Sequence, residues 1–354
     1  MLIDSFNRKI DYLRLSVTDR CNLRCKYCMP QEGVAPILHE DVLRYEEIIR
    51  AAGIFAALGI KKIRITGGEP LVRKGVASLI GDLRKIRGID EMTLTTNGIL
   101  LGENAKSLYN AGISRINISL DTLNPSKYNM LTRGGNIGNV IDSIVIAQKV
   151  GFNKIRINAV LSDYFEKKDA YELISFARDN GMAVRFIEMM HMTASDKEII
   201  NNPLNLPNVE CSTAFAPDNN KNTVSRKRLH SEDIIKIMED IGNYHKDNSA
   251  KDCWGPSEYY IDESKKSKIG LITNSNKACF SCNRLRLSPE GTLRLCLFSD
   301  MEMDLKALLR STSTNDDIIK KVLIDFIKTK PENRQSSCVS NDLKLPGFMN
   351  RIGG

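Results

Sequence analysis

The chain has 354 residues, of which 42% are hydrophobic and 27% charged, and its formal net charge is +8. This length allows one large α/β domain, or one domain with a smaller unit attached, and the composition excludes wholesale disorder. The lysines and arginines are dispersed along the chain rather than gathered in blocks. We therefore expect local binding sites for an anion and no nucleic-acid partner.

The sequence shows no sign of a membrane segment. It has no run of about eighteen apolar residues, and its first residues lack the charged, apolar and small-residue zones of a signal peptide. We predict a cytoplasmic protein without a membrane partner. In that compartment grouped cysteines bind metal or do redox chemistry more often than they form disulfides.

Strand-like runs alternate with amphipathic stretches in the first half of the chain. Over 45–58 the apolar residues recur at helical spacing, Gly59 ends the helix, and 61–66 then alternates as a strand does. Strands are predicted at 12–17, 61–66, 92–96, 115–119, 154–160 and 183–188, and helices at 45–58, 74–87, 103–111, 138–150 and 168–180. This alternation predicts a parallel sheet with helices packed outside it.

Six such units are too few for a closed eightfold barrel, so they form either a partial barrel or an open doubly wound sheet. In both folds, ligands bind at the carboxyl ends of the strands. We predict the partial barrel: an α/β protein with a partial (β/α)6 TIM-type barrel and a smaller C-terminal α+β module.

The pattern changes after Met190. Residues 193–228 are rich in Asn, Ser and Pro, which predicts an irregular insertion or linker. A helix is expected to follow Ser231 as its N-cap, with two more near 304–310 and 316–329. The predicted domains are a barrel over 1–192, the insertion over 193–228, and a C-terminal module over 229–354.

The first group of cysteines is Cys21, Cys25 and Cys28, in the spacing CxxxCxxC after the first strand. A structural zinc site takes four protein ligands, whereas a 4Fe-4S cluster held by three thiolates keeps one iron open to another ligand. The spacing therefore favours an iron–sulfur cluster, and a zinc loop completed by a distant residue is the alternative.

The segment "GGEP" (67–70) follows the second predicted strand. Two glycines let the backbone approach a ligand closely, and Glu69 can accept a hydrogen bond from an ammonium group. Without the cysteines, a plain turn would be the simpler interpretation.

A second group consists of Cys279, Cys282 and Cys296, again without an obvious fourth ligand. No histidine lies within this stretch, so a zinc site would need a remote one. Arg284 and Arg286 alternate on a predicted strand and point to one face, where guanidinium groups suit phosphate or purine oxygens. The alternative is two arginines on a solvated strand face. Cys211, Cys253 and Cys338 are isolated and are interpreted as structural or incidental.

Together the first cysteine group and "GGEP" resemble the radical S-adenosylmethionine (SAM) superfamily. The segments "LRLSVTDRCNLRCKYCMP", "IRITGGEPLVR", "GLITNSNKACFSCNRLRLSPEGTLRLCLF" and the terminal "MNRIGG" further resemble the GTP 3',8-cyclase (MoaA) family of molybdenum cofactor biosynthesis. The resemblance covers nearly the whole chain except about 193–228. There the family commonly has a shorter stretch containing Gly and Trp.

The resemblance implies a lyase with two 4Fe-4S clusters that uses SAM to make a 5'-deoxyadenosyl radical. In the family, this radical takes the 3'-hydrogen of GTP and the C3' radical attacks C8 of guanine. The product is (8S)-3',8-cyclo-7,8-dihydroguanosine 5'-triphosphate, the first intermediate of the pathway. The second cluster holds the guanine at its open iron.

Matching to the family assigns a role to individual residues. The first cluster would be held by Cys21, Cys25 and Cys28, and the second by Cys279, Cys282 and Cys296. SAM would contact Tyr27, Gly68, Glu69, Ser119 and Met190. GTP would contact Arg14, Arg64, Thr95, Arg156, Arg185, Arg284 and Arg286, with Arg156 where the family usually has Lys. Arg284, Arg286, Gly353 and Gly354 would take part in catalysis, the two glycines by threading into the active-site cavity; a loose tail is the alternative for them.

The family also implies partners. These are an electron donor such as flavodoxin or ferredoxin, the next pathway enzyme (cyclic pyranopterin monophosphate synthase) that takes the product, and often a second copy in a homodimer. Two other functions are considered: a radical SAM enzyme acting on a peptide, and a zinc or nucleic-acid-binding protein without activity. Arg284, Arg286 and Gly354 favour GTP over a peptide.

Overall fold

The computed structural model describes residues 1–190, 228–247, 255–262, 267–275, 278–299 and 301–333. The strands are β1 (Leu2–Ile3), β2 (Lys9–Ile10), β3 (Tyr12–Ser16), β4 (Lys62–Thr66), β5 (Glu91–Thr96), β6 (Arg115–Ser119), β7 (Ile155–Leu161), β8 (Ala183–Glu188), β9 (His245–Lys246), β10 (Glu258–Asp262), β11 (Ser267–Ile272), β12 (Arg284–Leu287), β13 (Thr292–Arg294) and β14 (Glu302–Asp304). The helices are α1 (Tyr45–Leu58), η1 (Pro70–Val72), α2 (Val76–Arg84), α3 (Leu101–Asn110), α4 (Pro125–Thr132), α5 (Ile137–Val150), α6 (Lys167–Asp179), α7 (Ser231–Ile241), α8 (Leu305–Arg310) and α9 (Asp316–Lys328).

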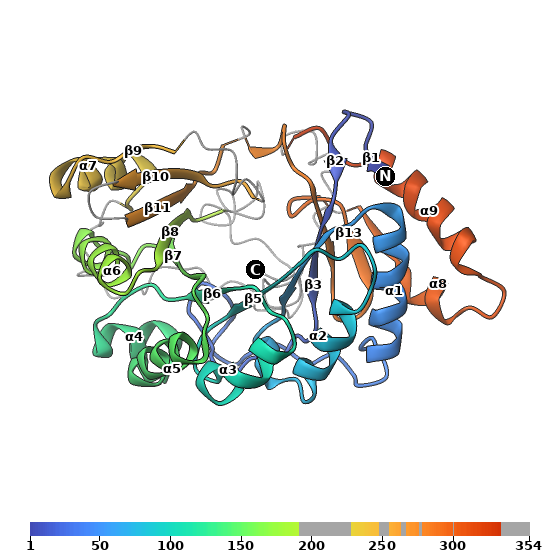
Figure 1. Ribbon diagram of the computed structural model, residues 1–354, viewed down its shortest axis with the longest axis horizontal. Helices are drawn as coiled ribbons and strands as arrows, with labels where there is room; N and C mark the ends of the chain where they lie inside the picture. Colours follow the sequence, from blue (N-terminus) through green and yellow to red (C-terminus); the bar gives the residue numbers. More distant parts are fainter. Residues whose placement is uncertain (191–227, 248–254, 263–266, 276–277, 300, 334–354) are drawn as a thin grey trace, which may run out of the picture.

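One curved sheet organises the molecule, with the strand order β14-β13-β12-β3-β4-β5-β6-β7-β8-β11-β10-β9. The run from β12 to β11 is parallel throughout, and the strands at both ends are antiparallel. In Figure 1 the strands curve into part of a ring, and α1 to α6 lie outside them. The partial barrel is therefore confirmed.

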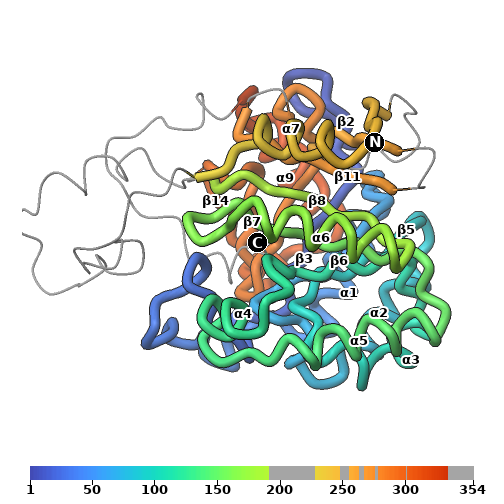
Figure 2. Tube along the Cα trace, turned by 90° about the vertical axis from the view of Figure 1, so that its left-hand side faces the viewer, coloured from blue at the N-terminus to red at the C-terminus, as the bar shows by residue number. Residues whose placement is uncertain are grey.

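The described strands of the predicted C-terminal module belong to the same sheet as those of the barrel. Its strands β11 and β12 pair in parallel with β8 and β3, which are the last and first strands of the predicted barrel. The sheet is thus continuous across the proposed boundaries at 192 and 228, and those boundaries stay a prediction. Figure 2 shows α7 of this module next in line to α6 and α5 along one side of the molecule.

Alternation along each strand separates an apolar outer face from a polar inner one. Leu13 and Leu15 of β3 and Ile63 and Ile65 of β4 are at most 1% exposed and belong to the hydrophobic core. Since successive side chains point to opposite faces, the residues between them point to the inner, concave face of the sheet. The sequence thus buries its aliphatic side chains against the helices and turns arginines inward.

The predicted elements of the barrel are confirmed, each beginning and ending within three residues of its expected bounds. Helix α4 was not predicted, although Asn124 caps it through the Lys127 amide and Pro125 opens it. Ser231 as an N-cap is wrong: His230 occupies that position, and the Ser231 hydroxyl donates to the Glu188 carboxylate instead. No helix among the described residues is long and apolar enough to cross a membrane.

Candidate active site

The first cysteine group lies in the loop between β3 and α1. The Cys28 amide donates to the Cys25 carbonyl at 2.9 Å, and the Leu23 amide to Cys21 Sγ at 3.4 Å. Burial raises the pKa of Cys21 to about 11 and that of Cys28 to about 12, and neighbouring thiols add to the pKa rise at Cys25 and Cys28. One partly buried loop therefore supplies three sulfur donors, and this donor set fits a 4Fe-4S cluster.

The carboxyl end of α4 fastens this loop. Arg133 Nη1 donates to the carbonyls of Arg24 and Met29, both at 2.9 Å, on either side of Cys25 and Cys28. Arg133 itself has a φ of 54°, in the left-handed region that a residue with a side chain seldom adopts. One guanidinium thus joins the two flanks of the cysteine loop.

The glycines of "GGEP" make room for the cysteine loop. A Cβ at Gly67 would lie 2.7 Å from the Thr18 carbonyl oxygen, and one at Gly68 would lie 2.4 Å from that of Arg20. The close approach expected of these glycines is therefore made, but by the protein's own backbone. Any side chain at Gly68 would displace the backbone of the loop that leads from β3 into the cysteines.

Glu69 is fully buried, and its carboxylate has protein partners. It accepts from the Leu71 amide at 3.1 Å, the Thr96 hydroxyl at 2.8 Å and the Asn97 amide at 2.7 Å. Burial raises the pKa of Glu69 to about 7, against the effect of these hydrogen bonds. The carboxylate therefore joins the "GGEP" turn to the end of β5, and its place as an ammonium acceptor stays a prediction.

Tyr27, predicted to contact SAM, is held by a residue that the sequence interpretation missed. Its phenol donates to Asp121, whose carboxylate also accepts from the Val160 amide at 2.8 Å. Burial raises the pKa of Asp121 to about 6. Ser119 ends β6 and Met190 follows β8, so these two lie at the carboxyl ends of their strands, as predicted.

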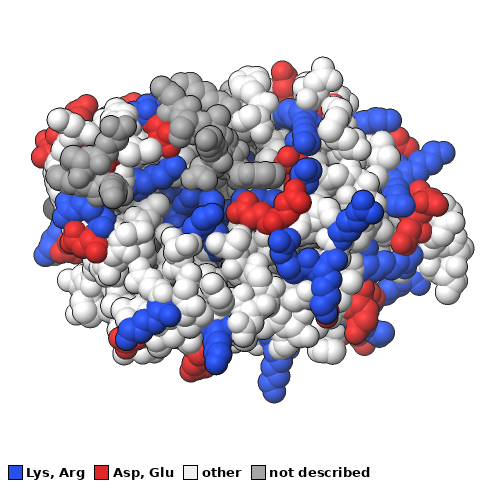
Figure 3. Space-filling view, viewed as in Figure 1, with Lys and Arg blue, Asp and Glu red and all other residues white. Residues whose placement is uncertain are grey.

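The predicted GTP-binding arginines line the inner face of the sheet. Arg286 pairs in register with Arg14, and Arg14 with Arg64, so the three form one lateral row across β12, β3 and β4. Arg156 of β7 and Arg185 of β8 are each 6% exposed. In Figure 3, Lys and Arg atoms gather near the middle of the face shown, next to a group of Asp and Glu atoms.

These cations interact with one another. Burial lowers the pKa of Arg156 to about 9, with Arg185 contributing next, and it lowers the pKa of Arg286 to about 10, with Arg284 contributing next. Burial and then Arg286 likewise lower the pKa of Arg14. We call this set of inward residues (Arg14, Arg64, Arg156, Arg185, Arg284 and Arg286) the arginine basin. Like charges held this close favour an anionic ligand.

Several buried polar atoms in the basin have no hydrogen-bond partner among the described residues. They are Thr95 Oγ1, Arg156 Nε, Asn158 Oδ1, Arg185 Nε and the Tyr12 hydroxyl. Each such group costs about 1–3 kcal/mol unless a ligand or water satisfies it. A polar molecule in the basin would recover this free energy.

The second cysteine group lies at the other end of the same strands. Cys282 precedes β12 and Cys296 follows β13, and because these strands are antiparallel their ends meet. Burial alone would raise the pKa of Cys282, but Arg284 and Lys330 outweigh it and lower the pKa to about 6. A sulfur donor set beside two cations again fits an iron–sulfur cluster.

The arginine basin lies between the two cysteine groups. β12 runs parallel to β3, with Arg284 beside Tyr12. The first group follows the carboxyl end of β3, whereas the second precedes the amino end of β12. They are thus separated along the strands by roughly 15 Å, the length of the five residues of β3.

In the described part of the chain no three His, Cys, Asp or Glu side chains are arranged to hold a single metal ion.

Two further basin residues were missed by the sequence interpretation. Tyr12 is 1% exposed, and Lys62 Nζ and Arg64 Cζ lie 5.3 Å and 5.5 Å from the centre of its ring. Tyr12 shares the inward alternation of Arg14, which could have identified it. Tyr259 comes from β10, and no local pattern links that strand to the barrel.

Gly353 and Gly354 lie outside the described residues, as do residues 193–227 of the predicted insertion.

Known proteins match both halves of the chain. A model of the radical SAM superfamily matches residues 15–177, and one described as Molybdenum Cofactor Synthesis C matches residues 214–336. A GTP 3',8-cyclase of Peptoclostridium acidaminophilum is 42% identical over 355 residues, covering 100% of this chain and 98% of that protein. The chain belongs to the GTP 3',8-cyclase family. The GTP 3',8-cyclase of Petrotoga mobilis is 41% identical and that of Thermodesulfovibrio yellowstonii 38%, and both align over at least 99% of either chain.

Membership in this family confirms the resemblance seen in the sequence, together with its cofactors, SAM and 4Fe-4S clusters. Among solved structures, Streptococcus suis SuiB bound to precursor peptide SuiA has a TM-score of 0.56 at 16% identity. The match covers 92% of this chain and 72% of SuiB. At that identity the likeness concerns the fold alone.

Proposed function

We propose that this chain is a GTP 3',8-cyclase that converts GTP to (8S)-3',8-cyclo-7,8-dihydroguanosine 5'-triphosphate, the first step of molybdenum cofactor biosynthesis. One observation carries the proposal: a basin of six inward arginines lies between two three-cysteine groups. Such a basin suits a polyphosphate, and the cysteine groups at its two ends suit a radical source and a second cluster.

The cysteines would hold the two clusters, and Tyr27, Gly68, Glu69, Ser119 and Met190 would surround SAM. When bound, the first cluster and SAM supply a 5'-deoxyadenosyl radical, and the second cluster offers an open iron to the guanine. Everything else falls to the residues of this chain, which bind the substrate, orient it and exclude water.

The arginines would bind and orient GTP. Arg14, Arg64, Arg156, Arg185 and Thr95 would receive the triphosphate. Arg156 Nε, Arg185 Nε and Thr95 Oγ1 have no hydrogen-bond partner among the described residues and could bind it directly. Arg284 and Arg286 lie nearest the second cysteine group and would fix the guanine end. This arrangement would place C3' toward the first cysteine group, where the hydrogen is removed. Gly353 and Gly354 would complete the cavity and assist catalysis.

Burial of the basin serves the radical chemistry. Arg64, Arg156 and Arg185 are each 6% exposed even before a substrate covers them. A primary carbon radical attacks whatever C–H bond it meets, so the protein must keep water and its own side chains away from it. Guanidinium groups bind the polyphosphate while offering no weak C–H bond at the contact.

The proposal includes partners and a compartment. A one-electron donor such as flavodoxin or ferredoxin would reduce the first cluster, and the next enzyme, cyclic pyranopterin monophosphate synthase, would rearrange the product. We place the protein in the cytoplasm and propose a homodimer as its working state.

The test is an anaerobic incubation of the reconstituted protein with dithionite, SAM and GTP. We expect about eight irons per chain for two clusters. We also expect 5'-deoxyadenosine and the cyclic triphosphate in equal amounts by mass spectrometry. 5'-Deoxyadenosine without any cyclic product from GTP would reject the substrate and leave the radical fold in place. A colourless protein that contains zinc would reject the whole proposal.

A further inference from the structure

Tyr259 enters the arginine basin from a part of the chain far from the barrel strands. It lies on β10, which is separated from β8 by β11 in the sheet. Its neighbour Tyr260 packs against the hydrophobic core. Because successive residues of a strand point to opposite faces, Tyr259 points inward, toward the arginines.

Tyr259 contacts both arginines on this side of the basin. Arg185 Nη2 donates to its hydroxyl at 2.9 Å, and Arg156 Cζ lies 5.2 Å from the centre of its ring. Lys268 Nζ lies 4.7 Å from the same ring. The ring face attracts cations, and the hydroxyl fixes the direction of one guanidinium.

A glycine makes this contact geometrically feasible. In the register of the sheet, Gly270 of β11 stands between Tyr259 and Arg185 and pairs with each of them. A Cβ at Gly270 would lie 2.8 Å from Tyr259 Cε1 and 3.3 Å from Arg185 Cγ. The missing side chain thus leaves the gap across which Tyr259 reaches Arg185, two strands away.

We propose that Tyr259 is a positioning residue that orients Arg156 and Arg185 to receive the phosphate chain of the nucleotide. The inference rests on the proposed function, since it takes the ligand of the basin to be GTP. Tyr259 contacts the guanidinium group of each arginine, and the buried Nε of each still has no hydrogen-bond partner among the described residues. Tyr259 therefore leaves donors free for an anion and limits the directions in which they point. Affinity should then depend on the number of phosphates.

The experiment compares Tyr259→Phe with wild type, both anaerobically reconstituted, and measures the dissociation constants for GTP, GDP and GMP. We expect Tyr259→Phe to weaken GTP binding about three- to tenfold, with a smaller effect on GDP. This is less than the loss of a charged hydrogen bond to the ligand itself, because the lost bond orients Arg185 and does not contact GTP. GMP binding should change less than twofold. The KM for GTP should rise while kcat at saturating GTP stays within about twofold, because the chemical step is untouched.

Two further variants separate positioning from stability. Gly270→Ala, which would push the ring away from Arg185, should reproduce the dependence on phosphate number without altering Tyr259. Tyr260→Phe, a matched change on the opposite face of β10, should leave all three dissociation constants unchanged. Because Tyr259→Phe keeps the volume of the ring, we expect it to fold with the melting temperature of the wild type.

The inference is overturned if Tyr259→Phe binds GTP as tightly as the wild type does, or if GTP and GMP binding fall by the same factor. Failure of the proposed function would appear elsewhere, as wild-type protein that forms no cyclic product from GTP.

Discussion

At the scale of single residues, the site is built from cations that repel one another until a ligand arrives. Arg286 illustrates this: burial lowers its pKa to about 10, and Arg284 contributes while the nearby cysteines act in the opposite direction. It stands in the row with Arg14 and Arg64 and next to the second cysteine group. An arginine in this place can contact the ligand at the end away from the radical source.

Replacing Arg286 should therefore separate radical formation from its use. In Arg286→Ala we expect formation of the cyclic product to fall about 10- to 150-fold in kcat/KM, the range for losing a charged hydrogen bond. 5'-Deoxyadenosine should then exceed the cyclic product, and both clusters should remain. Coupled turnover at the wild-type rate would show that Arg286 does not orient GTP. Arg286→Lys keeps the charge but loses the bidentate hydrogen-bond donor, so its kcat/KM should lie between those of Arg286→Ala and the wild type.

Gly68 is the residue whose replacement should damage the first cysteine loop directly. An alanine Cβ there would lie 2.4 Å from the Arg20 carbonyl oxygen, a backbone atom that cannot move alone. We expect Gly68→Ala to lower the free energy of unfolding by about 2–3 kcal/mol and to reduce iron in the first cluster. Gly81→Ala is the control, because nothing lies within 4 Å of its Cβ and it sits in helix α2. If both variants keep full iron and stability, the packing role assigned to Gly68 is wrong.

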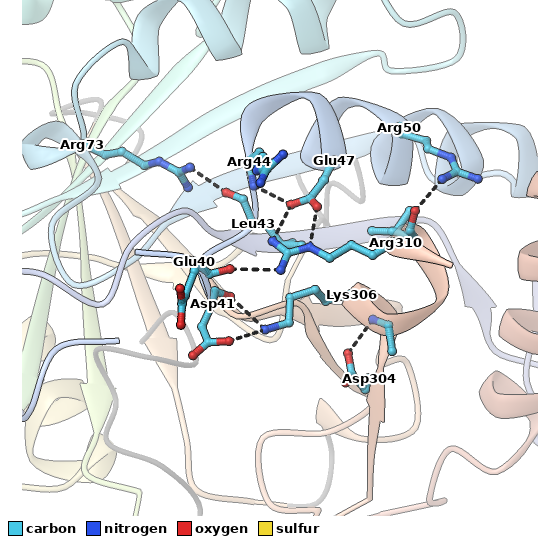
Figure 4. Close-up of polar contacts among 12 residues, drawn as sticks. Glu40, Asp41, Leu43, Arg44, Glu47, Arg50, Arg73, Asp304, Lys306 and Arg310 are labelled. Atoms are coloured by element: carbon cyan, nitrogen blue, oxygen red, sulfur yellow. Dashed lines mark hydrogen bonds and ion pairs between the residues drawn. The ribbon is translucent and has the colours of Figure 1, made fainter. Parts of the chain in front are cut away.

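At the scale of elements, the segment after the cysteines is held in place where it leads into α1. Arg73 donates to the Leu43 carbonyl at 2.6 Å, and Lys306 of α8 bonds Asp41 at 2.9 Å (Figure 4). Arg310, also of α8, pairs with Glu47 of α1 at 2.6 Å. Partly exposed pairs of this kind contribute about 0–1 kcal/mol each, so they orient the segment more than they stabilise it.

Helix α4 has the more direct effect on the loop, through Arg133. We expect Arg133→Gly to keep the left-handed turn, since glycine adopts it without strain, and to lose both bonds to the loop carbonyls. Iron loss from the first cluster to a chelator should accelerate about tenfold or more, because two hydrogen bonds from a charged donor are lost. The second cluster should be unaffected, which electron paramagnetic resonance of the reduced protein can follow.

The matched control for Arg133 is Arg87→Gly, which removes an exposed arginine from the turn between α2 and β5. It should leave the rate of iron loss from both clusters unchanged. If Arg133→Gly and the wild type lose iron from the first cluster at equal rates, the cysteine loop keeps its shape without the hydrogen bonds of Arg133.

At the scale of the whole molecule, sequence patterns predicted the barrel but not how it ends. Alternation and helical spacing identified β3 to β8, because these patterns are local. The pairing of β12 with β3 joins residues some 270 positions apart, and no local period encodes it. Arg284 and Arg286 were singled out because they alternate on a predicted strand beside cysteines, whereas the other inward arginines were assigned from the resemblance to the family. Tyr259 was missed because its role depends on the register of β10 with β11 and on a gap at Gly270.

The arrangement also explains the basic composition. The chain has a net charge of +8, and six of its arginines lie in the arginine basin. These six therefore do not contribute to a basic outer surface of the kind that binds nucleic acid. With a three-cysteine group at each end of that basin, the arrangement suits one anionic substrate between the two proposed cluster sites.

The central claim is that a radical made at the first cysteine group takes the hydrogen from C3' of GTP. It is tested most directly with GTP carrying deuterium at C3', incubated anaerobically with SAM, dithionite and the reconstituted protein. The account predicts that the 5'-deoxyadenosine formed carries that deuterium and that the cyclic product lacks it. 5'-Deoxyadenosine without deuterium, with the label retained in GTP or in any product, would contradict it.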